Sequence, residues 1–212
     1  VSPDSPSPSA SETAGFGVDL SSEDQILVLD FGGQTAQLIT RRVREENVFC
    51  QLVRHNLSAE RIRKINPKGI ILSGGPDSVY GEGAPQPDPE IFDLGIPVLG
   101  ICYGMQVACQ ASGGQVTPSQ DREYGDTTIF LNEPDNPIFH GCDERMQVWM
   151  SHGDHVSAIA PGFEVYGTSP NAPFAVTADP AREFYAVQFH PEVHHTPKGA
   201  KLYENFIRRA GF

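Results

Sequence analysis

The chain has 212 residues, enough for one substantial α/β core but cramped for two full domains. Its net charge of −12 argues against a nucleic-acid partner, and no apolar run reaches the roughly 18 residues needed to cross a membrane. The four cysteines form no C-x-x-C pair, which favours a reducing, cytoplasmic location. Because the chain begins at Val1 instead of Met, we expect it to be part of a longer protein.

The first 24 residues are rich in serine and proline. Such a segment buries too little apolar surface to offset the entropy lost on ordering, so residues 1–24 are predicted to be disordered. The segment contains Asp4, Glu12 and Asp19, and the first basic residue of the chain is Arg41, a pattern that is not typical of a targeting peptide. One folded domain is then predicted over residues 25–212.

The first half of this domain alternates short apolar runs with helical patterns. Strands are predicted at 26–30, 49–53, 69–72 and 97–101, with helices at 37–44, at about 58–65 and after Gly104. The stretch 80–90 is rich in glycine and proline and is expected to be a loop. Continuous apolar strands separated by helices are typical of a parallel sheet covered on both faces.

The pattern changes after residue 114. Further strands are predicted at 127–131, 146–151, 163–168, 174–177 and 185–189, without long helices between them, and a closing helix at 198–210. We interpret this half as an antiparallel extension of the same sheet, not as a second domain. The predicted class is therefore α/β, with helices on both faces of a mostly parallel sheet.

A candidate nucleophile lies where the fourth strand meets its helix. Residues 100–104 read G-I-C-Y-G, the thiol version of the strand–turn–helix elbow that exposes a nucleophile. Small residues two positions away on each side let the strand and helix backbones pass closely. The positive end of the helix favours a thiolate and a developing oxyanion. The alternative is that Cys102 is a buried core cysteine at a strand end.

The last predicted strand ends at a possible base. Residues 190–192 read H-P-E, and a histidine at the carboxyl end of a parallel strand lies on the same edge of the sheet as Cys102. A carboxylate two residues later is placed to orient the imidazole. The order Cys102, His190, Glu192 then predicts a nucleophile, a base and an orienting group. Alternatively, His190 is a surface residue and Glu192 a solvated charge.

A glycine-rich turn follows the third strand, with S-G-G-P at 73–76. Backbone N–H groups in such turns are free to face a ligand, and we expect those of Gly75 and Tyr103 to form an oxyanion hole. Residues 73–78 also fit S-G-G-x-D-S, a pyrophosphate-binding loop. That loop normally follows the first strand of its domain, and Pro76 lacks the donor that a phosphate requires, which disfavours this alternative.

Metal binding is another interpretation of the second half. The possible ligands are His152, Asp154, His155, His190, Glu192, His194 and His195. Their spacing fits no helical H-x-x-x-H face, they are expected on two different loops, and no cysteine pairs with them, so no metal site is predicted. Cys109 follows Cys102 by two helical turns, which favours packing over a redox pair.

Four motifs resemble those of class I glutamine amidotransferases. They are L-D-F-G at 29–32, I-L-S-G-G-P at 71–76, G-I-C-Y-G-M-Q at 100–106 and V-Q-F-H-P-E at 187–192. A fifth, V-W-M-S-H-G-D at 148–154, resembles the domains of GMP synthetases more than those that serve anthranilate, CTP or carbamoyl phosphate synthesis. The likeness extends over residues 25–212. Thr35 departs from it, since these domains often have tyrosine there, and we expect a change in the pocket wall or an interdomain contact.

The resemblance implies a flavodoxin-like fold and hydrolysis of glutamine to glutamate and ammonia. It assigns the catalytic triad to Cys102, His190 and Glu192, and the oxyanion hole to Gly75 and Tyr103. It also implies that a group of residues surrounds the bound glutamine, with Asp154 suited to the α-ammonium. This group consists of Gly74, Gln106, Ser151, His152, Gly153 and Asp154.

The resemblance also implies a partner. The amidotransferase domain needs no cofactor or metal of its own. Its ammonia would pass to adenylated xanthosine monophosphate in an ATP pyrophosphatase (synthetase) domain or subunit, where ATP and Mg²⁺ would bind. Three alternatives stay open at this point: an amidotransferase of another biosynthetic pathway, a stand-alone γ-glutamyl thiol hydrolase, and an inactive amidotransferase-like binding module.

Overall fold

The structure, a computed structural model, describes residues 24–132 and 136–212. Apart from Asp24, the segment predicted to be disordered lies outside the described residues. Within the two described ranges, no helix is both long enough and apolar enough to cross a membrane.

The predicted parallel sheet is confirmed. Its strands are β1 (Ile26–Asp30), β2 (Cys50–Arg54), β3 (Gly69–Leu72), β4 (Val98–Ile101) and β9 (Phe184–Val187). They lie side by side in the order β2-β1-β3-β4-β9 and all run in the same direction. Every residue of β3, β4 and β9 is buried, because helices cover both faces of the sheet. The arrangement is that of a flavodoxin-like fold.

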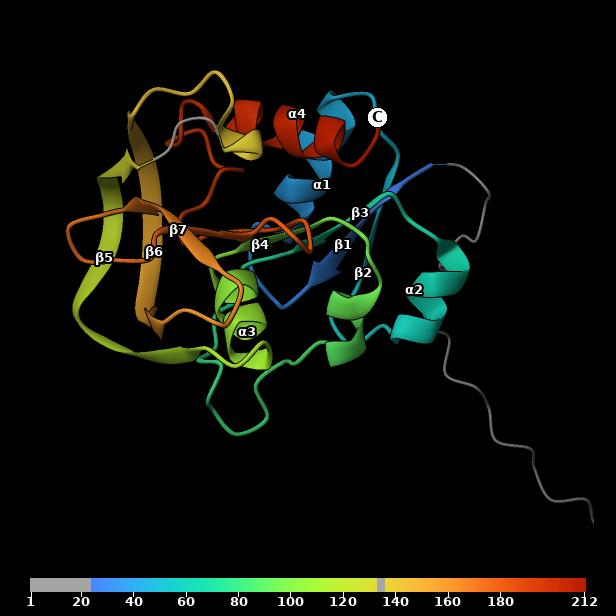
Figure 1. Cartoon of the computed structure of the whole chain (residues 1–212), viewed down its shortest axis with the longest axis horizontal. Helices are drawn as coiled ribbons and strands as arrows, with labels where there is room; N and C mark the ends of the chain where they lie inside the picture. Colours follow the sequence, from blue (N-terminus) through green and yellow to red (C-terminus); the bar gives the residue numbers. More distant parts are fainter. Residues whose placement is uncertain (1–23, 133–135) are drawn as a thin grey trace, which may run out of the picture.

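The helices form the two outer layers (Figure 1). Helices α1 (Ala36–Glu45) and α4 (Gly199–Arg209) cover one face, and α2 (Ala59–Ile65), α3 (Tyr103–Ala111) and the 3₁₀ helix η1 (Pro89–Asp93) cover the other. Each face has its own apolar core. Ser58 caps the start of α2, since its hydroxyl accepts a hydrogen bond from the Arg61 N–H.

Four antiparallel strands extend the sheet beyond β9. They are β8 (Val176–Asp179), β7 (Glu164–Thr168), β5 (Gln115–Leu131) and β6 (Arg145–Ala158), in this spatial order. The extension was predicted, but β5 and β6 are much longer than expected and form one long hairpin, and a short 3₁₀ helix, η2 (Pro137–Phe139), lies between them. The extra residues are largely polar because most of this hairpin is covered on one face at most.

The topology brings four turns together at one edge of the sheet. The chain leaves β1, β3, β4 and β9 at their carboxyl ends, and these strands are neighbours. β1 and β3 also flank the point where the strand order reverses, which is where open α/β sheets bind ligands. The hairpin of β5 and β6 stands beside this edge (Figure 1), and its residues border the cavity that lies there.

Candidate active site

Cys102 occupies a sharp turn between β4 and α3. Its backbone has φ +51° and ψ −107°, a conformation that costs a non-glycine residue about 1–3 kcal/mol. The turn is fastened by two hydrogen bonds, from the Cys102 N–H to the Val187 carbonyl (2.8 Å) and from the Gln106 N–H to the Cys102 carbonyl (3.1 Å). The side chain is 5% exposed and borders a cavity at the start of α3. The predicted elbow is therefore present.

The glycines that flank the elbow allow α3 to lie against β3. A Cβ on Gly104 would lie 2.4 Å from the Leu72 carbonyl oxygen, and one on Gly100 would lie 3.0 Å from the Gly104 oxygen. The first contact is closer than real Cβ atoms tolerate and the second is tighter than most, and in both the neighbour is a backbone atom that cannot turn aside. The G-x-C-x-G spacing thus reflects this close backbone approach.

Gly104→Ala should destabilise the fold. Separating α3 from β3 enough to admit a methyl group is expected to cost about 1–3 kcal/mol, the usual range for overpacking, and to lower the melting temperature by several degrees. Gly153→Ala is the matched control, because its new Cβ would meet nothing closer than 3.6 Å. Equal melting temperatures for the two variants would contradict the close approach.

His190 follows β9 and is paired with Glu192. The distance from His190 Nδ1 to Glu192 Oε1 is 2.7 Å, and the Glu192 side chain is fully buried. Two further groups hold Glu192 in place: the Thr35 hydroxyl donates to the same Oε1 (2.7 Å), and Arg42 Nε donates to the backbone carbonyl of Glu192 (2.9 Å). The carboxylate therefore fixes the ring orientation from the side away from Cys102.

The protonation of His190 is set by its neighbours. Burial of the ring acts to lower the pKa of His190, but the charge and hydrogen bonding of Cys102, and then of Glu192, outweigh it and raise this pKa well above the usual range. A ring that retains its proton is the form that protonates a departing amine. The geometry agrees with a close approach of His190 to Cys102. A Cβ built on Gly74 would lie 3.0 Å from His190 Cε1 and 3.7 Å from Cys102 Cβ, so both side chains lie next to the same glycine.

The turn after β3 lies directly beside the elbow. Ser73 is buried, and its hydroxyl accepts from the Phe31 N–H (3.0 Å) and donates to the Gly74 carbonyl (2.9 Å). The close approach of Phe31 and Tyr103 leaves no room for a side chain at Gly75. The backbone of Gly75 borders the cavity next to Cys102, as an oxyanion hole requires. Because the Ser73 hydroxyl is already used inside the protein, the pyrophosphate-loop alternative gains no support.

The cavity in front of Cys102 has a volume of about 590 Å³. Five of the six residues expected around a bound glutamine border it, and they are Gln106, Ser151, His152, Gly153 and Asp154. The sixth, Gly74, lies behind this wall, between His190 and the elbow. Residues 152–154 belong to strand β6 and not to a loop, which corrects the expectation from the sequence.

Asp154 projects from β6 toward the loop after β3. Its Oδ2 accepts a hydrogen bond from the Ser78 hydroxyl and its Oδ1 accepts one from the Tyr80 hydroxyl. Both partners belong to the loop between β3 and η1, which therefore closes one side of the cavity. A carboxylate at this position offers a partner to a substrate cation.

His152 has a supporting position. Its Nδ1 lies 2.7 Å from the Asp154 carbonyl and its Nε2 lies 3.0 Å from Glu123 Oε2, so neither nitrogen is left for a ligand. Glu123 is itself buried and accepts from the Ser169 hydroxyl. A direct role of His152 in glutamine binding stays a prediction. Its hydrogen bond to the Asp154 carbonyl indicates instead that His152 holds the Asp154 backbone in place.

The other chemistry-bearing side chains lie apart from this cavity. Among the described residues, no group of three or more His, Cys, Asp or Glu side chains is placed to hold a metal ion. Cys109 is buried and its thiol contacts the Ala158 carbonyl (3.5 Å), in agreement with the predicted packing role. Burial raises the pKa of the Cys109 thiol to about 11.

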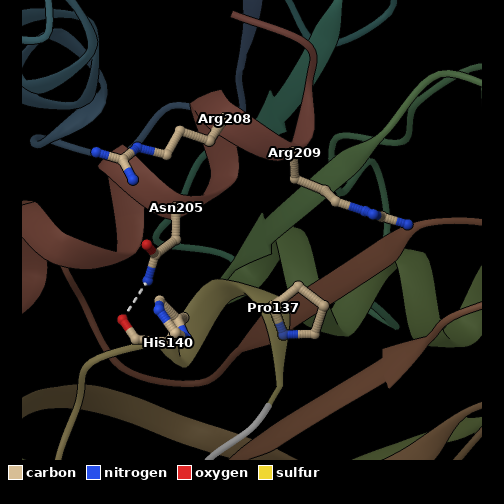
Figure 2. A pocket seen from close by; sticks show the side chains of 5 residues that line it. All are labelled: Pro137, His140, Asn205, Arg208 and Arg209. Carbon is tan, nitrogen blue, oxygen red and sulfur yellow. Dashed lines mark hydrogen bonds between the residues drawn. The ribbon is translucent and has the colours of Figure 1, made fainter.

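A second hollow, of about 350 Å³, lies by α4 and η2 on the opposite layer of the fold (Figure 2). It is bordered by Pro137, His140, Asn205, Arg208 and Arg209. Both arginines are paired with carboxylates, Arg208 with Glu204 and Arg209 with Glu183. The residues that border this hollow include no nucleophile, so the cavity at Cys102 is the stronger candidate.

The family model for class-I glutamine amidotransferases matches residues 27–210. The chain belongs to this family. The amidotransferase is 56% identical over 197 residues to the glutamine-hydrolysing GMP synthase of Cereibacter sphaeroides, and 52% identical over 189 residues to that of Lactobacillus delbrueckii subsp. bulgaricus. These alignments cover 91% and 89% of the amidotransferase but only 38% and 37% of the relatives, so it spans about two fifths of their length.

Solved structures agree on the fold of the amidotransferase. A protein of Thermoplasma acidophilum that is described as part of a GMP synthase superposes with a TM-score of 0.80 at 29% identity, covering 88% of the amidotransferase and 94% of that chain. A Thermotoga maritima glutamine amidotransferase superposes with a TM-score of 0.67 at 18% identity, covering 88% and 97% of the two chains. The flavodoxin-like fold expected from the sequence is thereby confirmed.

Several polar contacts of the site in the amidotransferase were not expected from the sequence. The Thr35 hydroxyl donates to Glu192 Oε1, and the expected change in the pocket wall or an interdomain contact stays a prediction. The Thr196 hydroxyl accepts from the Trp149 N–H (3.0 Å) and donates to the His190 carbonyl (2.7 Å). Gln188 lies against Cys102, and a polar residue at the end of a continuous apolar strand is a signal that could have indicated it.

Proposed function

We propose that this amidotransferase hydrolyses glutamine through Cys102, His190 and Glu192 and supplies the ammonia for GMP synthesis. The single observation that carries the first part is the strained elbow at Cys102, which borders a cavity and has the His190–Glu192 pair beside it. The similarity to GMP synthases supports the second part.

In the proposed reaction the Cys102 thiolate attacks the side-chain amide carbon of glutamine. The backbone N–H groups of Gly75 and Tyr103 bind the oxyanion, and His190 gives its proton to the departing ammonia. A γ-glutamyl thioester remains on Cys102. His190 then takes a proton from a water molecule, which attacks the thioester and releases glutamate, while Glu192 keeps the imidazole oriented.

The cavity suits an amino acid with a carboxamide side chain. Asp154 would bind the α-ammonium, and the Ser78 and Tyr80 hydroxyls that contact it would rearrange around the ligand. The Gln106 amide, whose nitrogen faces inward, leaves its oxygen for the substrate. Ser151, His152 and Gly153 would complete the walls, and Gly74 would support them from behind.

The ammonia acceptor would be adenylated xanthosine monophosphate in an ATP pyrophosphatase domain or subunit, where ATP and Mg²⁺ would act. The relatives are more than twice as long as the matched region, which leaves room for such a part. We place the reaction in the cytoplasm, in keeping with the cysteine pattern of the sequence. A stand-alone thiol hydrolase and an inactive binding module are the outcomes that the following experiment separates.

The isolated chain is expected to be a poor glutaminase, and a synthetase part with ATP and xanthosine monophosphate should activate it. The competent site depends on turns after β3, β4 and β9, and small shifts among them misalign the reacting groups. A partner that favours the aligned state by about 3 kcal/mol would raise its population roughly a hundredfold when that state is rare.

The measurement is ammonia release from glutamine, with and without a GMP synthase from which the glutaminase part has been removed. Stimulation that requires both ATP and xanthosine monophosphate supports the proposal. Full turnover without the partner would indicate a stand-alone hydrolase. No turnover under either condition, with the chain folded, would indicate a binding module.

A further inference from the structure

A buried carboxamide lies against the sulfur of Cys102. Gln188 follows β9 directly, and because Ile101 and Val187 are paired across β4 and β9, the next residues of the two strands emerge side by side. The Gln188 side chain is 1% exposed, and its Nε2 donates to Cys102 Sγ at 3.6 Å. Gln188 is not among the residues that border the cavity, so this contact reaches the reacting atom from within the protein.

The orientation of this carboxamide is fixed by a second one. Gln106 Nε2 donates both to the Asp154 carbonyl (2.9 Å) and to Gln188 Oε1 (3.2 Å). A backbone carbonyl can only accept, so the nitrogen of Gln106 must face inward. Gln188 must then present its oxygen to Gln106 and its nitrogen to the sulfur, since a flipped amide would place two donors against each other.

A second polar group contacts the sulfur, and this one favours the neutral thiol over the thiolate. The Ser151 carbonyl lies 3.7 Å from Cys102 Sγ and can accept a proton only from the neutral thiol. The Gln188 N–H, by contrast, forms its stronger hydrogen bond with the thiolate, because one partner is then charged. The two contacts thus favour different protonation states of the same atom.

We propose that Gln188 is a catalytic residue that stabilises the Cys102 thiolate by N–H donation, and that Gln106 positions it. The chain of hydrogen bonds runs from the Asp154 carbonyl through both amides to the sulfur, linking the strand that borders the substrate cavity to the nucleophile. The proposal rests on the proposed function only in taking Cys102 as the nucleophile.

Titratable groups surround the elbow and its cavity, and the test must leave them in place. The titratable and charged groups around the elbow and its cavity are Asp77, Tyr80, Arg122, Glu123, Tyr124, His152, Asp154, His190 and Glu192. Gln188→Met removes the amide donor while keeping the volume and the burial of the side chain, and it changes none of these groups.

The test is the alkylation of Cys102 by iodoacetamide, followed by peptide mass spectrometry across a range of pH. In Gln188→Met the pH of half-maximal rate should rise by about one unit, and the rate near pH 7 should fall roughly tenfold, as expected for the loss of one charge-assisted hydrogen bond. Gln106→Met should shift the profile in the same direction but less, because the donor remains and only its orientation is lost.

Asn205→Met is the matched control. Its amide is also buried and donates to the Ile138 and His140 carbonyls by α4 (Figure 2), so the variant loses an amide and some stability without touching the elbow. An unchanged Cys102 profile in this variant and a raised one in Gln188→Met support the proposal. If Gln188→Met does not fold, Gln106→Met decides the question.

If the folded Gln188→Met protein shows the same pH dependence of Cys102 alkylation as the wild type, the proposed role of the amides is wrong. If Gln188→Met does not fold, the same result in Gln106→Met has this meaning. Equal shifts in Gln188→Met and Asn205→Met would also overturn it, by attributing the change to general destabilisation. Iodoacetamide needs neither glutamine nor a partner, so the result is independent of whether glutamine is the substrate.

Discussion

Cys102→Ala is expected to abolish glutamine hydrolysis, lowering turnover by roughly 10⁴-fold or more, because no other group that borders the cavity can form the thioester. The fold should be retained, since alanine fills less space than cysteine at the same turn. Ammonia and glutamate release report the activity, and circular dichroism reports the fold. Cys109→Ala, two turns further along α3, is the matched control and should remain active.

A glutamine-like electrophile should label the same residue selectively. Burial raises the pKa of the thiols of Cys50 and Cys142, and raises that of Cys109 to about 11, so all three remain protonated near neutral pH. Cys102 also borders the cavity into which the reagent would fit. Labelling of another cysteine while Cys102 stays unmodified would contradict the assignment of the nucleophile.

Asp154→Ala is expected to raise the KM for glutamine by roughly 10- to 150-fold. A hydrogen bond to a charged group contributes about 1.5–3 kcal/mol, and the proposed pairing of Asp154 with the α-ammonium is of this kind. Reaction of Cys102 with iodoacetamide should change far less, because Asp154 contributes only its backbone carbonyl to the elbow. Steady-state kinetics and alkylation rates measured on the same preparation separate these effects.

Tyr80→Phe is the control for this variant. It removes the hydroxyl that donates to Asp154 Oδ1 but leaves the carboxylate and its Ser78 partner. We expect its KM to change by less than that of Asp154→Ala. A KM that is the same in Asp154→Ala and wild type would remove Asp154 from the glutamine site.

The parallel half of the fold could be predicted because its strands are buried on both faces. A strand such as β3, with four buried residues, reads as a continuous apolar run that needs no knowledge of its neighbours. β5 could not be predicted over its full length, since its first part is polar and is held by pairing with β6 across a register shift between Pro118 and Glu123. Such a strand depends on tertiary pairing more than on its own periodicity.

The same division applies to the site. The residues of the proposed triad and the glycine turns lie in compact motifs, so residue types and their spacing were enough to single them out. The contacts of Thr35 with Glu192 and of Gln188 with Cys102 join residues that are 157 and 86 positions apart. Nothing in either segment alone specifies its partner, and only the packing of α1 and β9 against the rest of the fold creates these contacts.

The place of β9 in the sheet has a consequence for biosynthesis. It is the last strand of this sheet to be made, yet it lies between β4 and β8 near the middle of the sheet. Until the ribosome has delivered residues 184–187, β4 presents an unpaired, apolar edge, which is the kind of surface that recruits other chains or chaperones. His190, the proposed base, follows on the same stretch. The nascent chain therefore loses its aggregation-prone edge and gains its proposed proton donor in one late step.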